Sequence, residues 1–281
     1  MKKDELITRR RALIAGAAVL GAAGAAGTAL VLTAGRAAGP AGGLPLSGAQ
    51  ANRALKPSAY RLQPLAGYGP PPHGTQLRTL VRHEPFMRVS GPGRTLVLTF
   101  DDGPDPKYTP EILRTLREYD VHAMFFVCGQ MVAENKDLLG EMADDGHLVG
   151  NHTWSHPLLT KLSSSAIRSE LERTSEVIDE AYGEPPSWFR APYGEWNRAT
   201  YQIGAELGME PMAWTIDTND WARPGTRAIV GTIQKQAAPG VVVLSHDAGG
   251  DRSQSVQALR TYLPRLLDAG YHVTVPHRRN T

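Results

Sequence analysis

Short apolar runs alternate with longer amphipathic stretches from residue 94 to the end of the chain. The short runs are apolar or β-branched and predict strands. They lie at residues 95–100, 121–127, 147–150, 188–190, 212–216, 241–245 and 271–275. Helices are predicted between them, among them residues 110–119, about 131–144, and a long helix capped by Ser163. This alternation predicts an α/β domain around a parallel sheet, open or closed into a barrel, with functional side chains just beyond the carboxyl ends of the strands.

The first 38 residues have a different pattern, in which basic residues precede an apolar run. Lys and Arg crowd residues 1–11, and an Ala, Gly, Leu and Val run extends from residue 12 to about residue 32. This layout is typical of an export signal, and residues 8–14 resemble a twin-arginine signal, with Ala12 where a larger apolar residue is usual. An uncleaved membrane anchor is the alternative, because the run of about 21 residues reaches the roughly 20 that a spanning helix needs. Either way, we expect the rest of the chain to work outside the cytoplasmic membrane.

Composition narrows the classes of function. Residues 39–90 are rich in Pro, Gly, Ser and Ala and are predicted to be a linker before a single folded domain at residues 91–281. Beyond residue 38 the chain holds 24 basic and 26 acidic residues, without the basic stripe that nucleic-acid binding needs. Cys128 is the single cysteine, so a disulfide or a thiolate cluster within the chain is excluded. We predict no nucleic-acid or protein partner, and any metal site must use histidine and carboxylate ligands.

Two adjacent aspartates, Asp101 and Asp102, directly follow the first predicted strand and precede a Gly-Pro turn. Like charges at the end of a buried strand raise each other's pKa unless a cation compensates them. A metal ion would supply that compensation. A solvated turn is the alternative interpretation of the same residues.

Two histidines, His152 and His156, lie four residues apart just after another predicted strand. That spacing places both imidazoles on one side of a helical turn. Two histidines and one carboxylate are a common ligand set of catalytic zinc, which leaves positions open for water and substrate. Together with the aspartate pair, they predict a site for one divalent metal ion in a metal-dependent hydrolase. His147, by contrast, is predicted to be structural, because its spacing to His152 suits a strand and turn.

Three further polar segments follow predicted strands, at residues 190–194, 217–221 and 244–247. Arg190 can hold a carboxylate ionised, and the Pro-containing turn after it can direct a backbone N–H toward an oxyanion. His246 ends an apolar strand and, with an aspartate to raise its pKa, suits a general acid for a leaving amine. An ordinary turn and a histidine satisfied in a polar loop are the alternatives.

Taken together, residues 99–104, 152–156, 190–194, 217–221 and 244–247 resemble the five motifs of the polysaccharide deacetylases, in the family's order. This is the fourth family of carbohydrate esterases, which share a chitooligosaccharide deacetylase homology domain. The resemblance covers roughly residues 94–275 and implies a distorted (β/α) barrel with about seven repeats in one catalytic domain. It also implies that Asp102, His152 and His156 hold the metal, most often zinc, with cobalt or nickel sometimes tolerated.

The resemblance implies roles for three residues around the attacking water. Asp101 would be the general base, and Arg190 would fix and polarise Asp101. The backbone N–H of Tyr193 would help to stabilise the tetrahedral oxyanion.

The remaining roles concern the leaving group and the acetyl methyl group. His246 would be the general acid for the departing amine, with Asp220 tuning its pKa. Trp221 and Leu244 would line the pocket for the methyl group. An amide needs such a separate acid, because its nitrogen leaves poorly unless it is protonated.

The resemblance implies an exported enzyme that releases acetate from an N-acetylglucosamine-containing glycan, with peptidoglycan or chitin-type polymers as the expected extracellular substrates. An O-acetyl ester of xylan or a small non-sugar amide is a second possibility for the same machinery. A glycan-binding protein that has lost activity is a third, which the presence of both Asp101 and His246 disfavours. The tryptophans Trp154, Trp188 and Trp196 fit sugar stacking and core packing equally well.

Overall fold

The computed structural model of the protein describes residues 79–276. The predicted export signal at residues 1–38 and residues 39–78 of the predicted linker lie outside this range. Within it, every helix is too short or too polar to cross a membrane.

The described residues form a curled, eight-stranded sheet whose paired strands are all parallel. In chain order the strands are β1 (Thr95–Asp101), β2 (Met124–Val127), β3 (Leu148–Asn151), β4 (Trp188–Phe189), β5 (Glu210–Pro211), β6 (Ile216–Asp217), β7 (Val242–His246) and β8 (His272–Val273). Their spatial order is β5-β4-β3-β2-β1-β7-β6, and β8 pairs with the start of β1. All of β1 is buried, as expected for the central strand of a parallel sheet covered on both faces.

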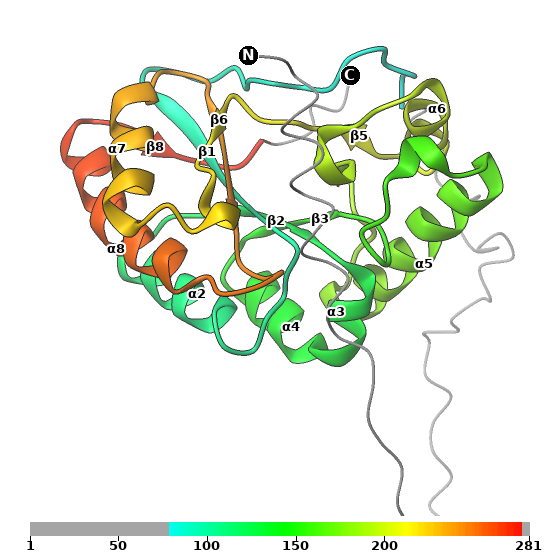
Figure 1. Ribbon diagram of the computed structural model, residues 1–281, viewed down its shortest axis with the longest axis horizontal. Helices are drawn as coiled ribbons and strands as arrows, with labels where there is room; N and C mark the ends of the chain where they lie inside the picture. The colour runs from blue at the N-terminus through cyan, green and yellow to red at the C-terminus, as the bar shows by residue number, and fades with distance from the viewer. Residues whose placement is uncertain (1–78, 277–281) are drawn as a thin grey trace, which may run out of the picture. The chain divides into compact units, whose positions relative to one another are not determined.

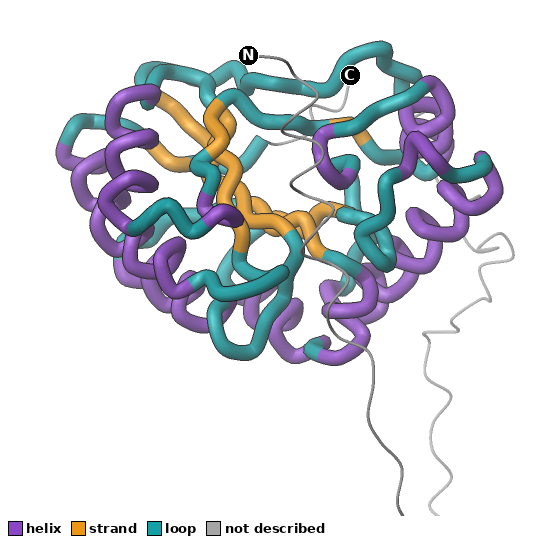
Figure 2. The backbone as a smooth tube through the Cα atoms, viewed as in Figure 1, coloured by secondary structure: helices purple, strands orange, loops and turns teal. Residues whose placement is uncertain are grey.

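Helices pack around the outside of this sheet (Figures 1 and 2). They are α2 (Thr109–Glu118), α3 (Gly129–Glu134), α4 (Lys136–Asp144), α5 (Ser164–Tyr182), α6 (Arg198–Glu206), α7 (Thr226–Gln236) and α8 (Ser253–Asp268), with short 3-10 turns η1 (Leu159–Lys161), η2 (Pro192–Gly194) and η3 (Asp220–Ala222). The predicted cap of α5 is present, because the Ser163 side chain accepts a hydrogen bond from the backbone N–H of Ala166. The α/β fold and the distorted barrel predicted from the sequence are confirmed.

Successive side chains of each strand point to opposite faces, and this alternation separates the core from the site. Leu96, Leu98 and Phe100 of β1 belong to the large core cluster between sheet and helices. Val97 belongs to a second cluster, inside the curl of the sheet. By the same alternation Asp101 faces inward, which directs its carboxylate into the barrel.

Two details differ from the sequence prediction. The helix predicted at about 131–144 is two helices that meet at Asn135, whose backbone has φ −140° and ψ 49° and whose side chain donates to the carbonyl of Met131 (2.9 Å). The strand predicted at 212–216 is also wrong, because β5 ends at Pro211 and β6 starts only at Ile216.

The segment at residues 86–89 lies between β5 and the residues that precede β7. The Phe86 N–H donates to the Pro211 carbonyl (2.8 Å), and the Val89 N–H donates to the Gly240 carbonyl (2.9 Å). Phe86 and Val89 also pack against the inner core cluster. The last residues of the segment predicted as a linker therefore contact the barrel.

Candidate active site

The predicted polar residues gather where the parallel strands end. Asp101 is the last residue of β1 and pairs in register with His246, the last residue of β7. His152 follows the last residue of β3, and Arg190 follows the last residue of β4. The structure thus brings together four segments far apart in the sequence, as expected for an α/β domain.

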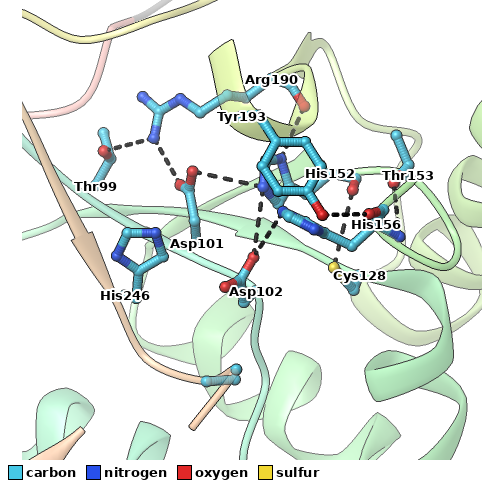
Figure 3. A network of polar contacts seen from close by, with 12 residues as sticks. Thr99, Asp101, Asp102, Cys128, His152, Thr153, His156, Arg190, Tyr193 and His246 are labelled. Atoms are coloured by element: carbon cyan, nitrogen blue, oxygen red, sulfur yellow. Dashed lines mark hydrogen bonds and ion pairs between the residues drawn. The ribbon is translucent and has the colours of Figure 1, made fainter. Parts of the chain in front are cut away.

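Asp102, His152 and His156 point toward one another (Figure 3) and offer ligand atoms that all lie within 4.8 Å of one another. The Oδ1 atom of Asp102 is 3.5 Å from Nε2 of His152 and 3.3 Å from Nε2 of His156. This oxygen is buried and has no hydrogen-bond partner among the described residues. Asp102 and His156 have φ angles of 77° and 56°, a region that non-glycine residues rarely adopt and that is typical of functional sites.

The protonation states of these three side chains favour a cation between them. The Nδ1 atom of His152 lies 2.8 Å from the Arg190 carbonyl, which can only accept, so Nδ1 carries the proton and Nε2 presents a lone pair. Burial lowers the pKa of His152 to about 3 and also lowers the pKa of His156. Burial alone would raise the pKa of Asp102, but the nearby histidines, His246 foremost, hold it below its ordinary value. Two neutral imidazoles and one carboxylate therefore face each other, and this donor set fits a divalent metal ion.

Asp101 lies next to this group and is held by Arg190. The guanidinium Nη1 donates to Oδ1 of Asp101 (2.6 Å) and to Oγ1 of Thr99 (2.8 Å). Both charged side chains are buried, with 0% and 3% of their side-chain surfaces exposed. Burial raises the pKa of Asp101 to about 6, and the charge of Arg190 limits that rise.

His246 lies across the two aspartates from the metal histidines (Figure 3). Its Nδ1 atom is 2.7 Å from Oδ1 of Asp220, and its backbone N–H donates to Oδ2 of the same carboxylate (2.9 Å). Burial lowers the pKa of His246, but the hydrogen bond and charge of Asp220 outweigh this and raise it to about 9. The imidazole is therefore protonated at neutral pH, with Nδ1 bonded to Asp220 and Nε2 left to donate a proton.

The other predicted residues surround this centre. Tyr193 lies in η2 with φ 63°, and its ring packs edge-on against His156 with centroids 4.7 Å apart. Trp221 lies in η3 and has 37% of its surface exposed, whereas Leu244 is buried in β7. The strand before η3 is β6, which pairs with β7 at Asp217 and Leu244. The two predicted pocket residues, Trp221 and Leu244, therefore come from neighbouring elements.

Comparisons with known proteins agree with this geometry. The family model described as polysaccharide deacetylase matches residues 88–212. A chitooligosaccharide deacetylase of Rhizobium leguminosarum bv. trifolii is 38% identical over 205 residues, which cover 69% of this chain and 95% of the relative. The chain belongs to the polysaccharide deacetylase family. Another member, a peptidoglycan-N-acetylglucosamine deacetylase of Bacillus cereus, is 39% identical and aligns over 65% of this chain and 86% of its own length.

A solved structure in the family has the same fold. The Bc1960 peptidoglycan N-acetylglucosamine deacetylase matches with a TM-score of 0.65 and 33% identity, over 68% of this chain and 90% of its own. As a member of the polysaccharide deacetylases, this chain is a hydrolase that acts on acetylated polysaccharide.

Sequence reasoning assigned no role to several residues that support the site, although Thr99 and Asp247 lie inside the predicted motifs. Thr99 joins the Arg190 pair, and Ser255 donates to Oδ2 of Asp220 (2.6 Å). Asp247 accepts a hydrogen bond from Thr109 (2.6 Å) and packs against Gly103. The polar Thr99 inside an apolar strand was a visible signal, because strand alternation places it on the same face as Asp101. The other contacts join helices to loops, and no spacing in the sequence reveals them.

Proposed function

We propose that this protein is an exported, metal-dependent N-deacetylase that removes acetyl groups from N-acetylglucosamine residues of peptidoglycan or a chitin-type glycan. One observation carries the proposal. A carboxylate suited to a base, Asp101, and an imidazolium suited to an acid, His246, flank a ligand set that fits one divalent metal ion. Metal-dependent amide hydrolysis uses this combination of base, acid and electrophile.

Asp101 acts on the attacking water in this proposal. When bound by Asp102, His152 and His156, the metal supplies a Lewis acid that polarises the acetyl carbonyl and acidifies a water molecule. Asp101 takes a proton from the attacking water as the water oxygen bonds to the acetyl carbon. Arg190 orients the Asp101 carboxylate and keeps most of it ionised near neutral pH, since the charge of Arg190 opposes the rise in pKa caused by burial.

His246 completes the reaction at the leaving group. As the bond between the acetyl carbon and the sugar nitrogen breaks, Nε2 of His246 donates its proton to that nitrogen, and acetate and a free amine result. Asp220 holds Nδ1 and stabilises the imidazolium before the transfer. The Tyr193 backbone N–H is proposed to donate to the oxyanion, and Trp221 and Leu244 are proposed to contact the methyl group.

Three observations support the proposed substrate, the proposed export and the proposed metal. Relatives at 34 to 39% identity are named chitooligosaccharide deacetylases or peptidoglycan-N-acetylglucosamine deacetylases, which supports these two kinds of glycan as substrates. The charged and apolar pattern of residues 1–38 supports export, by the twin-arginine route or as a membrane anchor. The ligand set supports zinc, with cobalt or nickel as substitutes.

Acetate release from purified full-length protein loaded with Zn²⁺ tests the activity. Peptidoglycan, chitooligosaccharides and acetylated xylan are compared, with Asp101→Asn and a chelated sample as controls. We expect acetate from one of the two N-acetylglucosamine substrates, lost in both controls. The absence of release from all three substrates would refute the proposed activity, and recovery of the protein in the cytoplasm alone would refute export.

A further inference from the structure

The loop between the two metal histidines has an unusual backbone. Thr153 and His156 have φ angles of 72° and 56°, in the left-handed region that favours glycine. Such a backbone persists only where surrounding contacts hold it. The contacts of residues 153–156 therefore determine whether His152 and His156 face the same point.

One side of the loop is held by the start of α3. The backbone N–H groups of Gly129 and Gln130 donate to the carbonyls of Thr153 (3.0 Å) and Trp154 (3.1 Å). The Trp154 ring packs so close to Gly129 that a Cβ on that glycine would lie 2.3 Å from it. The first two carbonyl groups of the loop are thus fixed by the start of α3.

Two N–H groups of the loop bond locally. The Thr153 N–H donates to Oδ1 of Asn151 (2.8 Å), and the His156 N–H donates to Oγ1 of Thr153 (3.1 Å). Both acceptors lie within three residues of their donors. The first bond attaches the start of the loop to the end of β3, and the second lies within the turn.

The remaining two N–H groups both donate to one carboxylate, Glu170 of α5. Its Oε2 atom accepts from the backbone N–H of Trp154 (2.8 Å) and of Ser155 (2.9 Å). Its Oε1 atom accepts from the hydroxyl of Ser155 (2.9 Å). Hydrogen bonds to an ionised acceptor are about twice as strong as neutral ones, so three of them form a strong attachment.

The helix that carries Glu170 is itself fixed beside the first metal histidine. The Asn151 side chain, directly before His152, donates to the carbonyl of Leu171 (2.8 Å). Leu171 is fully buried, and the guanidinium of Arg173, three residues after Glu170, lies 4.0 Å from the centre of the Trp154 ring. Glu170 is therefore held at a set distance from the end of β3, and its hydrogen bonds hold the loop at that distance too.

We propose that Glu170 is a positioning residue that holds the 153–156 loop so that His152 and His156 bind one metal ion. The inference rests on the metal site of the proposed function. Without Glu170, the N–H groups of Trp154 and Ser155 and the Ser155 hydroxyl donate to water instead. The loop then relaxes toward ordinary backbone angles. His156, the histidine beyond the strained turn, then loses its alignment with Asp102.

Three variants separate this role from a general effect on folding. Glu170→Ala removes all three bonds while alanine favours the helix. In Glu170→Gln the amide oxygen can accept from both backbone N–H groups, and the amide N–H₂ can donate to the Ser155 hydroxyl. Glu172→Ala is the matched control, because Glu172 lies on the same helix and, among residues 79–276, is held only by a half-exposed ion pair with Arg168.

Zn²⁺ affinity of the full-length protein is measured by competition with a chromogenic chelator, together with the visible spectrum of the Co²⁺-loaded form and the melting temperature without metal. We expect Zn²⁺ binding about 10- to 100-fold weaker and an altered Co²⁺ spectrum in Glu170→Ala, as for other residues that orient metal ligands. We expect Glu170→Gln and Glu172→Ala to bind as the unmodified chain does, and all melting temperatures to stay close.

The outcomes separate the inference from the proposed function. Failure of the unmodified chain to bind Zn²⁺ would overturn the metal site and this inference with it. Tight binding by the unmodified chain and by Glu170→Ala alike would overturn the inference alone. Equal weakening in Glu170→Gln and Glu170→Ala would also overturn it, since charge rather than hydrogen-bonded positioning would then be the cause.

Discussion

Replacing Arg190 by methionine tests the energetic role of the buried ion pair. Arg190 is completely buried, and methionine fills much of its volume without donating any hydrogen bond. The change removes the bond to Asp101 (2.6 Å) and also the bonds to the carbonyls of Met212 (3.2 Å) and Ala213 (2.9 Å). We expect a large loss of stability in addition to a loss of activity.

The magnitude follows from what the substitution leaves behind. An uncompensated buried charge costs about 3 to 5 kcal/mol when its partner is removed. Each buried carbonyl left without a donor adds about 1 to 3 kcal/mol unless water reaches it. With about 2 to 4 °C per kcal/mol for a domain of this size, the charge alone predicts a melting temperature lower by about 6 to 20 °C.

Urea unfolding of the metal-free protein, followed by circular dichroism, measures this loss. Asp101→Asn and the double variant with Arg190→Met complete a double-mutant cycle. We expect the double variant to be more stable than the sum of the single losses predicts, by about 2 kcal/mol or more, because it leaves no lone charge. A loss below about 1 kcal/mol for Arg190→Met, or additive losses, would refute the reasoning.

Two further predictions concern residues outside the catalytic set. Gly103→Ala places a Cβ 2.2 Å from the Asp247 carboxylate and should destabilise by about 1 to 3 kcal/mol in urea, whereas Gly140→Ala, with open space around it, should not. Burial lowers the pKa of His147 from 6.5 to about 4, so the folded state loses up to about 3 kcal/mol as the pH falls from 6.5 toward 4. His147→Asn keeps an acceptor for the Ala123 N–H and should lose less over that range; equal losses would contradict the assignment.

The position of the site could be predicted because it depends on a simple rule. Parallel strands place their carboxyl ends at one edge, so Asp101, His152 and His246 had to lie near one another once the strands were recognised. Alternation along β1 also decides that Asp101 faces inward. The continuous apolar runs made these strands easy to recognise. The spacing of the two histidines indicated that they bind the same metal ion.

The parts that could not be predicted depend on contacts between distant residues. The helix break at Asn135 follows from a side chain that bonds the backbone of the preceding turn, which helical periodicity does not reveal. The gap between β5 and β6 accompanies the bonds of Phe86 to Pro211 and Ala213, more than 120 residues away. Glu170 looked like an ordinary helix-surface residue, because its partners lie in a loop 15 and 16 residues before it.

The most direct test of the central claim is the ratio of free amine to acetate produced by the Zn²⁺-loaded, full-length protein on peptidoglycan or chitooligosaccharide. Hydrolysis of an N-acetyl group with His246 as the acid releases one acetate for each new primary amine. We predict a ratio of about one, and neither product with Asp101→Asn. Acetate without amine would show that an ester is cleaved and would contradict the account, as would product formation by Asp101→Asn at the rate of the unmodified chain.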